Sequence, residues 1–182
     1  TQAHTLFPYT TLFRSPGATH YALIWSPTNA AATMFVREIR AAASARGLRL
    51  EAHEAPDRAQ LDRAFDAIAA SGAQALIIAP SPFAAAQREA LVAFAGAKRL
   101  PAMYFAEDFV DAGGLMSYGP SYADAYRRAA SYVDRILKGA RPGDLAVEQP
   151  TAFDLVVNAR TARALGLAMP PSILLRASRV IG

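Results

Sequence analysis

The sequence contains no cysteine, and only 3 of its 182 residues are histidine. The absence of cysteine excludes thiolate catalysis, iron–sulfur clusters and cysteine-ligated zinc, and it is compatible with either a reducing or an oxidising compartment. Long apolar runs are also missing, because Arg, Asp, Glu or Gln interrupts the alanine-rich stretches every few positions. A membrane-spanning helix needs about eighteen consecutive apolar residues. We therefore expect no transmembrane segment in this chain.

Charge is sparse and of mixed sign. The 19 Lys and Arg residues are interspersed with 15 Asp and Glu residues, which leaves a formal net charge of +4. Proteins that bind nucleic acid gather their basic residues on one face, so this pattern predicts no nucleic acid partner. With 53% hydrophobic and 19% charged residues, the composition is that of an ordinary globular domain and excludes disorder and collagen.

Motifs for nucleotide binding and catalysis are missing as well. Neither G-x-x-x-x-G-K-[ST] nor G-x-G-x-x-G occurs. Segment 114–119 resembles a nucleophile elbow around Ser117, but the spacing before the serine is one residue too long for G-x-S-x-G. No histidine has an obvious acidic partner to orient it as a base, and His53, near Glu51 and Glu54, lacks the H-E-x-x-H spacing and is interpreted as a solvated strand end. We expect no catalytic residue, no metal and no cofactor.

The first fifteen residues do not form an export signal, because their only basic residue is Arg14 and they lack an apolar core. Within them, Thr5–Ser15 (TLFPYTTLFRS) resembles the conceptual translation of a sequencing-adapter oligonucleotide at every position. We interpret residues 1–15 as a non-native leader, and the alternative is a short natural edge strand or arm. On the first interpretation the natural N-terminal part of the protein, including any export signal, is missing.

From Pro16 onward, short β-prone runs alternate with amphipathic, alanine-rich stretches, which is typical of βα units around a parallel sheet. The pattern predicts an α/β fold with a Rossmann-like, flavodoxin-like sheet. The clearest predicted helix, 122–138, carries Tyr122, Tyr126, Val133 and Ile136 on one face. Strands are expected at 21–25, 48–53, 75–78, 102–104, 115–118 and, last, 153–157, and the other helices at 29–46, 57–71, 84–98, 108–112, 160–165 and in a short tail after Pro171.

A candidate binding site follows from this pattern, because ligands of open α/β sheets bind outside the carboxyl ends of the strands. Ser26 and Asn29 follow the first expected strand, Ser81 and Phe83 follow the third, and Glu107 follows the fourth. We predict that these five side chains line one side of a cleft for a small polar molecule with an apolar part, without a catalytic constellation.

Glu107 also belongs to the densest acidic group of the sequence, together with Asp108 and Asp111. Such a group could serve as a general acid/base pair or as a site for a hard cation. The alternative is a solvated helical turn, which we favour for Asp108 and Asp111.

Several short segments together resemble one family, the bacterial ABC-transporter substrate-binding proteins linked to tryptophan and tyrosine uptake. The resemblance spans Pro16 to Gly182. It rests on 16–19, 25–27, 112–120 (AGGLMSYGP), 126–130, 132–134, 136–140, 147–151 (VEQPT), 153–158 (FDLVVN), 161–162, 164–167 and 170–172. Ser26-Pro27 stands where members of the family commonly have Asn-Pro, and Ala79 stands where an Asp often precedes the proline; both departures leave the solute open.

The resemblance implies a type I periplasmic-binding-protein fold, in which two Rossmann-like lobes hold a solute between them. It implies that 16–114 and 150–182 form the second lobe, that 115–149 is an excursion to the first lobe, and that the first lobe itself is missing. The implied function is that of an extracytoplasmic, periplasmic component that binds a small solute, such as an aromatic amino acid, and delivers it to an ABC permease.

Two other functions share this architecture. One is a flavodoxin-like enzyme domain that binds a nucleotide or a sugar at the same sheet edge, although the missing phosphate loop and base argue against it. The other is the effector-binding lobe of a transcription regulator, which an upstream helix-turn-helix would distinguish.

Overall fold

A computed structural model describes residues 17–28, 30–148, 150 and 152–182, so the predicted leader and Asn29 lie outside the described residues. Within them, the central feature is a seven-stranded sheet of order β2-β1-β3-β4-β5-β6-β7. The strands are β1 (His20–Trp25), β2 (Arg49–Glu54), β3 (Ala75–Ile78), β4 (Ala102–Tyr104), β5 (Met116–Pro120), β6 (Phe153–Asn158) and β7 (Arg179–Ile181).

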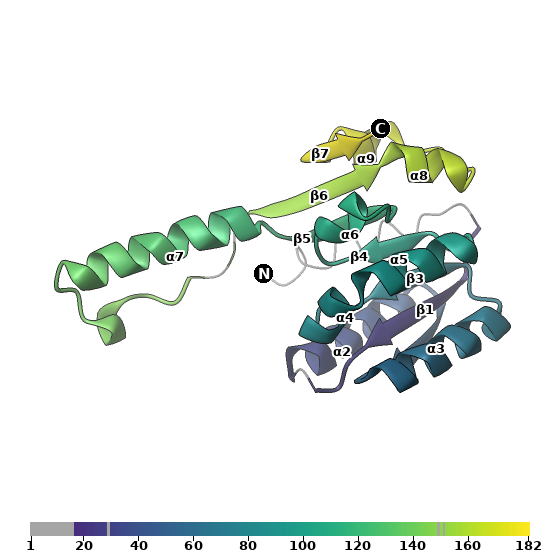
Figure 1. Cartoon of the computed structure of the whole chain (residues 1–182), viewed down its shortest axis with the longest axis horizontal. Helices are drawn as coiled ribbons and strands as arrows, with labels where there is room; N and C mark the ends of the chain where they lie inside the picture. The colour runs from purple at the N-terminus through teal and green to yellow at the C-terminus, as the bar shows by residue number, and fades with distance from the viewer. Residues whose placement is uncertain (1–16, 29, 149, 151) are drawn as a thin grey trace.

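The helices connect these strands in chain order (Figure 1). They are α2 (Ala30–Ser44), α3 (Arg58–Ser71), α4 (Pro82–Ala86), α5 (Arg88–Ala97), α6 (Asp108–Asp111), α7 (Tyr122–Leu137), α8 (Ala159–Ala164) and α9 (Pro171–Leu174), with a 3-10 turn at Pro142–Asp144.

Helices cover both faces of the sheet and create two apolar layers. On one face, Leu61 and Ile68 of α3, Leu91 of α5 and Phe109 of α6 pack with the inward residues of β1 and β3. On the other face, α2 and α8 pack against Leu23, Ile77 and Met103 of the sheet. The central strands β1 and β3 are therefore buried on both sides, as is usual for parallel sheets, and the predicted α/β fold class is confirmed.

Local sequence signals explain where α3 begins and ends. The Asp57 side chain accepts a hydrogen bond from the Gln60 backbone N–H at 2.8 Å, which caps the first turn. Gly72 ends the helix with a left-handed φ of +74°, a conformation that favours glycine. The helix predicted at 57–71 is therefore confirmed.

Three expectations about the elements were wrong. The helix predicted at 84–98 is two helices, because the Ser81 side chain caps a first helix that starts at Pro82, and Gln87, whose backbone is not helical, separates it from the second. The apolar face expected on the helix at 29–46, on Met34, Phe35 and Ile39, is partly wrong, because Met34 is 56% exposed and Val36 is buried instead. Phe153–Asn158 is not the last strand, since β7 follows it and pairs with it in parallel.

The sheet changes direction at β6. Strands β1 to β5 are parallel to one another, whereas β6 runs antiparallel to β5, with Pro120 opposite Phe153. Between these two strands the chain leaves the body of the molecule as an arm, made of α7 and the segment that returns along it (Figure 1). The excursion expected at 115–149 thus includes β5, which belongs to the sheet, and the part outside the sheet lies between Ser121 and Ala152.

Candidate functional site

The carboxyl ends of β1, β3 and β4 lie at one edge of the sheet, because these three strands are neighbours and parallel. The strand order reverses between β1 and β3: β2 lies on one side of β1, and all later strands lie on the other. Backbone hydrogen bonds fix the end of β1 on both sides, from Ala55 N–H to the Trp25 carbonyl (2.8 Å) and from Ala79 N–H to the Ile24 carbonyl (2.9 Å). This reversal is where flavodoxin-like folds bind their ligands.

Three of the predicted site residues follow β1 and β3 at this edge. Ser26 is buried, and its hydroxyl shares a 2.8 Å hydrogen bond with the hydroxyl of Thr28. Ser81 is also buried, and its hydroxyl accepts a hydrogen bond from Ala84 N–H at 3.0 Å. Phe83 is half-buried and packs against the apolar layer that contains Leu91. Ser81 and Phe83 therefore also hold α4 in place, and contact with a ligand stays a prediction for all three residues.

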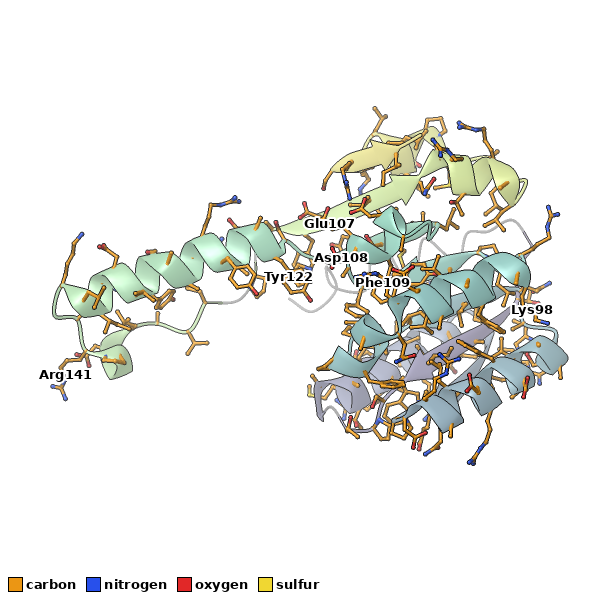
Figure 2. The ribbon with its side chains drawn as sticks, viewed as in Figure 1. Lys98, Glu107, Asp108, Phe109, Tyr122 and Arg141 are labelled. Atoms are coloured by element: carbon orange, nitrogen blue, oxygen red, sulfur yellow. The ribbon has the colours of Figure 1, made fainter. Side chains whose placement is uncertain are left out.

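Glu107 follows β4 and is exposed, but it is paired. Arg179 of β7 places Nη2 3.1 Å from Glu107 Oε2 and 2.8 Å from Asp111 Oδ1. The hydrogen bond to Asp111, aided by both carboxylates, raises the pKa of the Arg179 guanidinium. Asp108 lies 3.7 Å from Nη1 of Arg88. Figure 2 shows Glu107 and Asp108 toward the base of the arm, where Tyr122 lies, and Lys98 at the opposite end of the body.

These ion pairs change the interpretation of the acidic group. Arginines from β7 and α5 pair with its carboxylates, which lie on an exposed turn, and a role of Glu107 in ligand binding stays a prediction. Within the described ranges, no three His, Asp or Glu side chains are arranged to hold a metal ion. Sequence reasoning did not find Arg179, because the strand that carries it is only three residues long and was not predicted.

The sequence analysis also missed a cluster on the first two strands. His20 Nε2 lies 3.2 Å from Glu51 Oε1, and His53 Nε2 lies 3.9 Å from Glu51 Oε2. Arg49 pairs with the same carboxylate. The interpretation of His53 as a solvated strand end was wrong, since only 18% of its side chain is exposed and burial lowers its pKa. His20 does have an acidic neighbour, supplied by the parallel pairing of β1 with β2.

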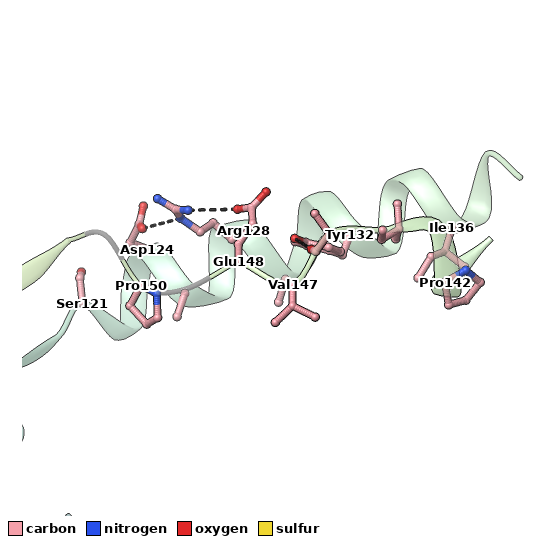
Figure 3. Close-up of a pocket in the computed structure, with 13 residues that line it drawn as sticks. Ser121, Asp124, Arg128, Tyr132, Ile136, Pro142, Val147, Glu148 and Pro150 are labelled. Atoms are coloured by element: carbon pink, nitrogen blue, oxygen red, sulfur yellow. Dashed lines mark hydrogen bonds and ion pairs between the residues drawn. The ribbon is translucent and has the colours of Figure 1, made fainter. Parts of the chain in front are cut away.

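A groove lies on the arm, away from the strand ends (Figure 3). It has a volume of about 560 Å³ and separates α7 from the segment that returns along it. Arg128 of α7 joins its two walls, because its guanidinium contacts Glu148 of the return segment at 3.1 Å. The same guanidinium contacts Asp124 of α7 at 2.8 Å. Tyr132 adds a hydrogen bond from its hydroxyl to the Ala146 carbonyl at 2.6 Å.

Comparison with known protein families assigns the chain to one of them. Residues 10–181 match the family described as ABC transporter substrate binding protein. The chain belongs to this family. In the described part of the chain, no helix is both long and apolar enough to span a membrane. A comparison with curated protein sequences gave no significant match.

Solved structures agree with the fold. A conserved domain protein from Vibrio cholerae superposes with a TM-score of 0.85 at 26% identity, over 95% of this chain and 59% of its own. An ABC domain in complex with L-Trp from Streptococcus pneumoniae gives a TM-score of 0.83 at 24% identity, over 92% of this chain and 56% of its own. CD0873, a ligand-free, open substrate binding protein with adhesive properties from Clostridium difficile, gives 0.68 at 17% identity, over 95% and 58%. This chain thus spans less than two thirds of each.

Proposed function

We propose that this chain supplies one lobe of an extracytoplasmic protein that holds a small solute between two lobes and delivers it unchanged to an ABC permease. Family membership is the observation that carries the proposal. The similar solved structures are longer than this chain, which leaves room in them for a second lobe. The open edge at the ends of β1, β3 and β4 is the surface that would face such a lobe.

We propose that the arm belongs with the other lobe, and that 16–120 and 153–182 form this one, which moves the expected boundaries at 114 and 150 to the ends of β5 and β6. β5 starts in the sheet, so we assign 121–152 as the segment that reaches the other lobe. The exposed apolar face of α7 supports this assignment. Tyr126 is 75% exposed and Val133 is 55% exposed, and such residues usually pack against a partner surface.

We propose an amino acid with an aromatic side chain as the solute, because the relative from Streptococcus pneumoniae was solved with L-Trp. The serine hydroxyls at positions 26 and 81 would bind its polar atoms, together with Asn29. The Phe83 ring would pack on its apolar part, and the Glu107 carboxylate would attract its ammonium group in competition with Arg179. Hydroxyl, aromatic and carboxylate groups at one edge suit this class of solute.

The test is a titration of the isotope-labelled chain, followed through its backbone amide signals. We expect L-Trp and L-Tyr to shift the signals of Ser26, Ser81, Phe83 and 105–107, with weak affinity, because the other lobe contributes no contacts and no closure energy to this chain. Ser26→Ala should weaken binding about tenfold. Ser44→Ala, at the exposed far end of α2, should leave it unchanged. Shifts caused by nucleotides or sugars, and by no amino acid, would contradict the proposal.

A further inference from the structure

Trp25 is the only tryptophan of the chain and the last residue of β1. It therefore lies at the strand end where the order of the sheet reverses, directly before Ser26. Its side chain is half-buried and packs against the apolar layer that contains Leu23 and Ile77. Its backbone is fixed by β2, since its carbonyl accepts the hydrogen bond from Ala55 N–H.

The indole N–H of Trp25 is buried and has no hydrogen-bond partner in the described part of the chain. A buried donor without an acceptor loses its hydration and gains nothing in exchange, and such groups are rare in folded proteins. The hydroxyls that follow it along the chain, on Ser26 and Thr28, are bonded to each other. An unpaired donor at a ligand-binding edge is explained if the ligand brings the acceptor.

The other unpaired buried polar atoms have different surroundings. Nε2 of His20 and Nε2 of His53 both face the Glu51 carboxylate. The Tyr104 hydroxyl ends β4, but its residue is fully buried, and its ring stacks on Phe109 at 4.8 Å between centroids. Among these residues, Trp25 is the one that ends β1, and its side chain is partly exposed although its Nε1 atom is buried.

We infer that Trp25 is a specificity-determining residue of the solute site, whose Nε1–H donates a hydrogen bond to an oxygen of the bound solute. This inference rests on the proposed function. The indole nitrogen can only donate, so it selects solutes with a carboxylate or carbonyl oxygen beside an apolar group that packs on the ring. It gives no favourable contact to an ammonium group at the same place. A carboxylate is the strongest acceptor of this class.

The experiment uses the single indole N–H signal of the chain, observed with two matched probes. L-Phenylalanine carries a carboxylate, and phenethylamine has the same ring and ammonium group without it. We expect L-phenylalanine to move the indole signal downfield with the edge amides, and phenethylamine to leave it in place. Trp25→Phe keeps an aromatic ring but removes the donor, and it should weaken L-phenylalanine binding about tenfold. Tyr104→Phe, which removes the other unpaired donor, should bind as the parent chain does.

Two results are distinguishable. If the edge amides shift with L-phenylalanine while the indole signal stays in place, or Trp25→Phe binds as tightly as the parent, the role of Trp25 is overturned and the proposed function stands. If no amide shifts with any amino acid, the proposed function is overturned and the inference with it. Should Trp25→Phe fail to fold, the indole signal of the parent chain still decides.

Discussion

At the scale of single residues, Gly119 marks the closest approach of β5 to the loop after β4. A Cβ at this position would overlap the backbone carbonyl of Phe105. Gly119→Ala should therefore lower the free energy of unfolding by more than about 2 kcal/mol, because backbone on both sides has to move. Urea unfolding measures this change.

Gly96→Ala is the matched control for that substitution. Gly96 lies inside α5, and nothing lies within 4 Å of the Cβ that alanine would add. This change should raise the free energy of unfolding by about 0.5–1 kcal/mol, since alanine has the higher helix propensity. If both substitutions change the free energy of unfolding by the same amount, the close approach of Gly119 to Phe105 does not affect stability.

The histidine cluster predicts that acid destabilises the fold. Burial lowers the pKa of His53 below 6.5, with Glu51 partly opposing, so its protonation favours the unfolded chain. Burial raises the pKa of Glu51, but Arg49 and the two histidines lower it more, and the net pKa lies below 4.5. Both contributions are present at high pH. The first is lost as pH falls below about 6.5 and through the folded pKa of His53, and the second is lost below about 4.5.

The thermal midpoint should therefore decrease in two steps as the pH is lowered from 8 to 4. His53→Gln removes the first group, so the decline between about pH 7 and pH 5.5 should become shallower. Glu51 remains in that variant, and the decline at lower pH should persist. A variant profile parallel to that of the parent over the whole range would rule out His53 as the source.

At the scale of elements, α7 is an amphipathic helix whose apolar face is largely exposed. None of its residues is buried, and Tyr122, Tyr126, Val133 and Leu137 are each more than half exposed. An apolar surface of this kind promotes association. The double change Tyr126→Lys and Val133→Lys should make the chain monodisperse across a concentration series in sedimentation velocity, with little loss of stability.

Val36→Lys on α2 is the control for this prediction. Val36 is 3% exposed, so a lysine there places a charge in the core and should unfold the domain. If the double variant of α7 also loses its cooperative unfolding transition, then α7 packs as a core helix and the exposed face seen here is wrong.

The two kinds of element also show what the sequence can predict. The bounds of α3 follow from Asp57 and Gly72, since a cap and a left-handed glycine act locally. The antiparallel direction of β6 and the existence of β7 depend on pairing with residues far along the chain, and β7 is three residues long. The loops after β1 and β3 could be predicted from strand order alone, whereas the pairing of Glu107 with Arg179 required the position of β7.

At the scale of the whole molecule, the structure divides into a body, which contains the sheet and the helices that cover it, and the arm. The chain leaves the sheet at Ser121 and returns at Ala152, and these two residues still share a hydrogen bond of 3.1 Å from Ser121 N–H to the Ala152 carbonyl. The internal contacts of the arm, such as Arg128 with Glu148, hold its helix to its own return segment. Figure 1 shows α7 directed away from the helices that cover the sheet.

This separation predicts the result of removing the arm. Replacing 122–151 with Asn-Gly would join β5 to β6 by a two-residue hairpin turn, whose twist suits antiparallel strands. Because no residue of α7 is buried, the shortened chain should keep its thermal midpoint within about 3 °C of the parent, measured by circular dichroism. It should also keep the amide shifts that amino acids cause at the strand ends. Loss of cooperative unfolding would show instead that the arm completes the body, and that the boundary at Ser121 does not separate two folding units.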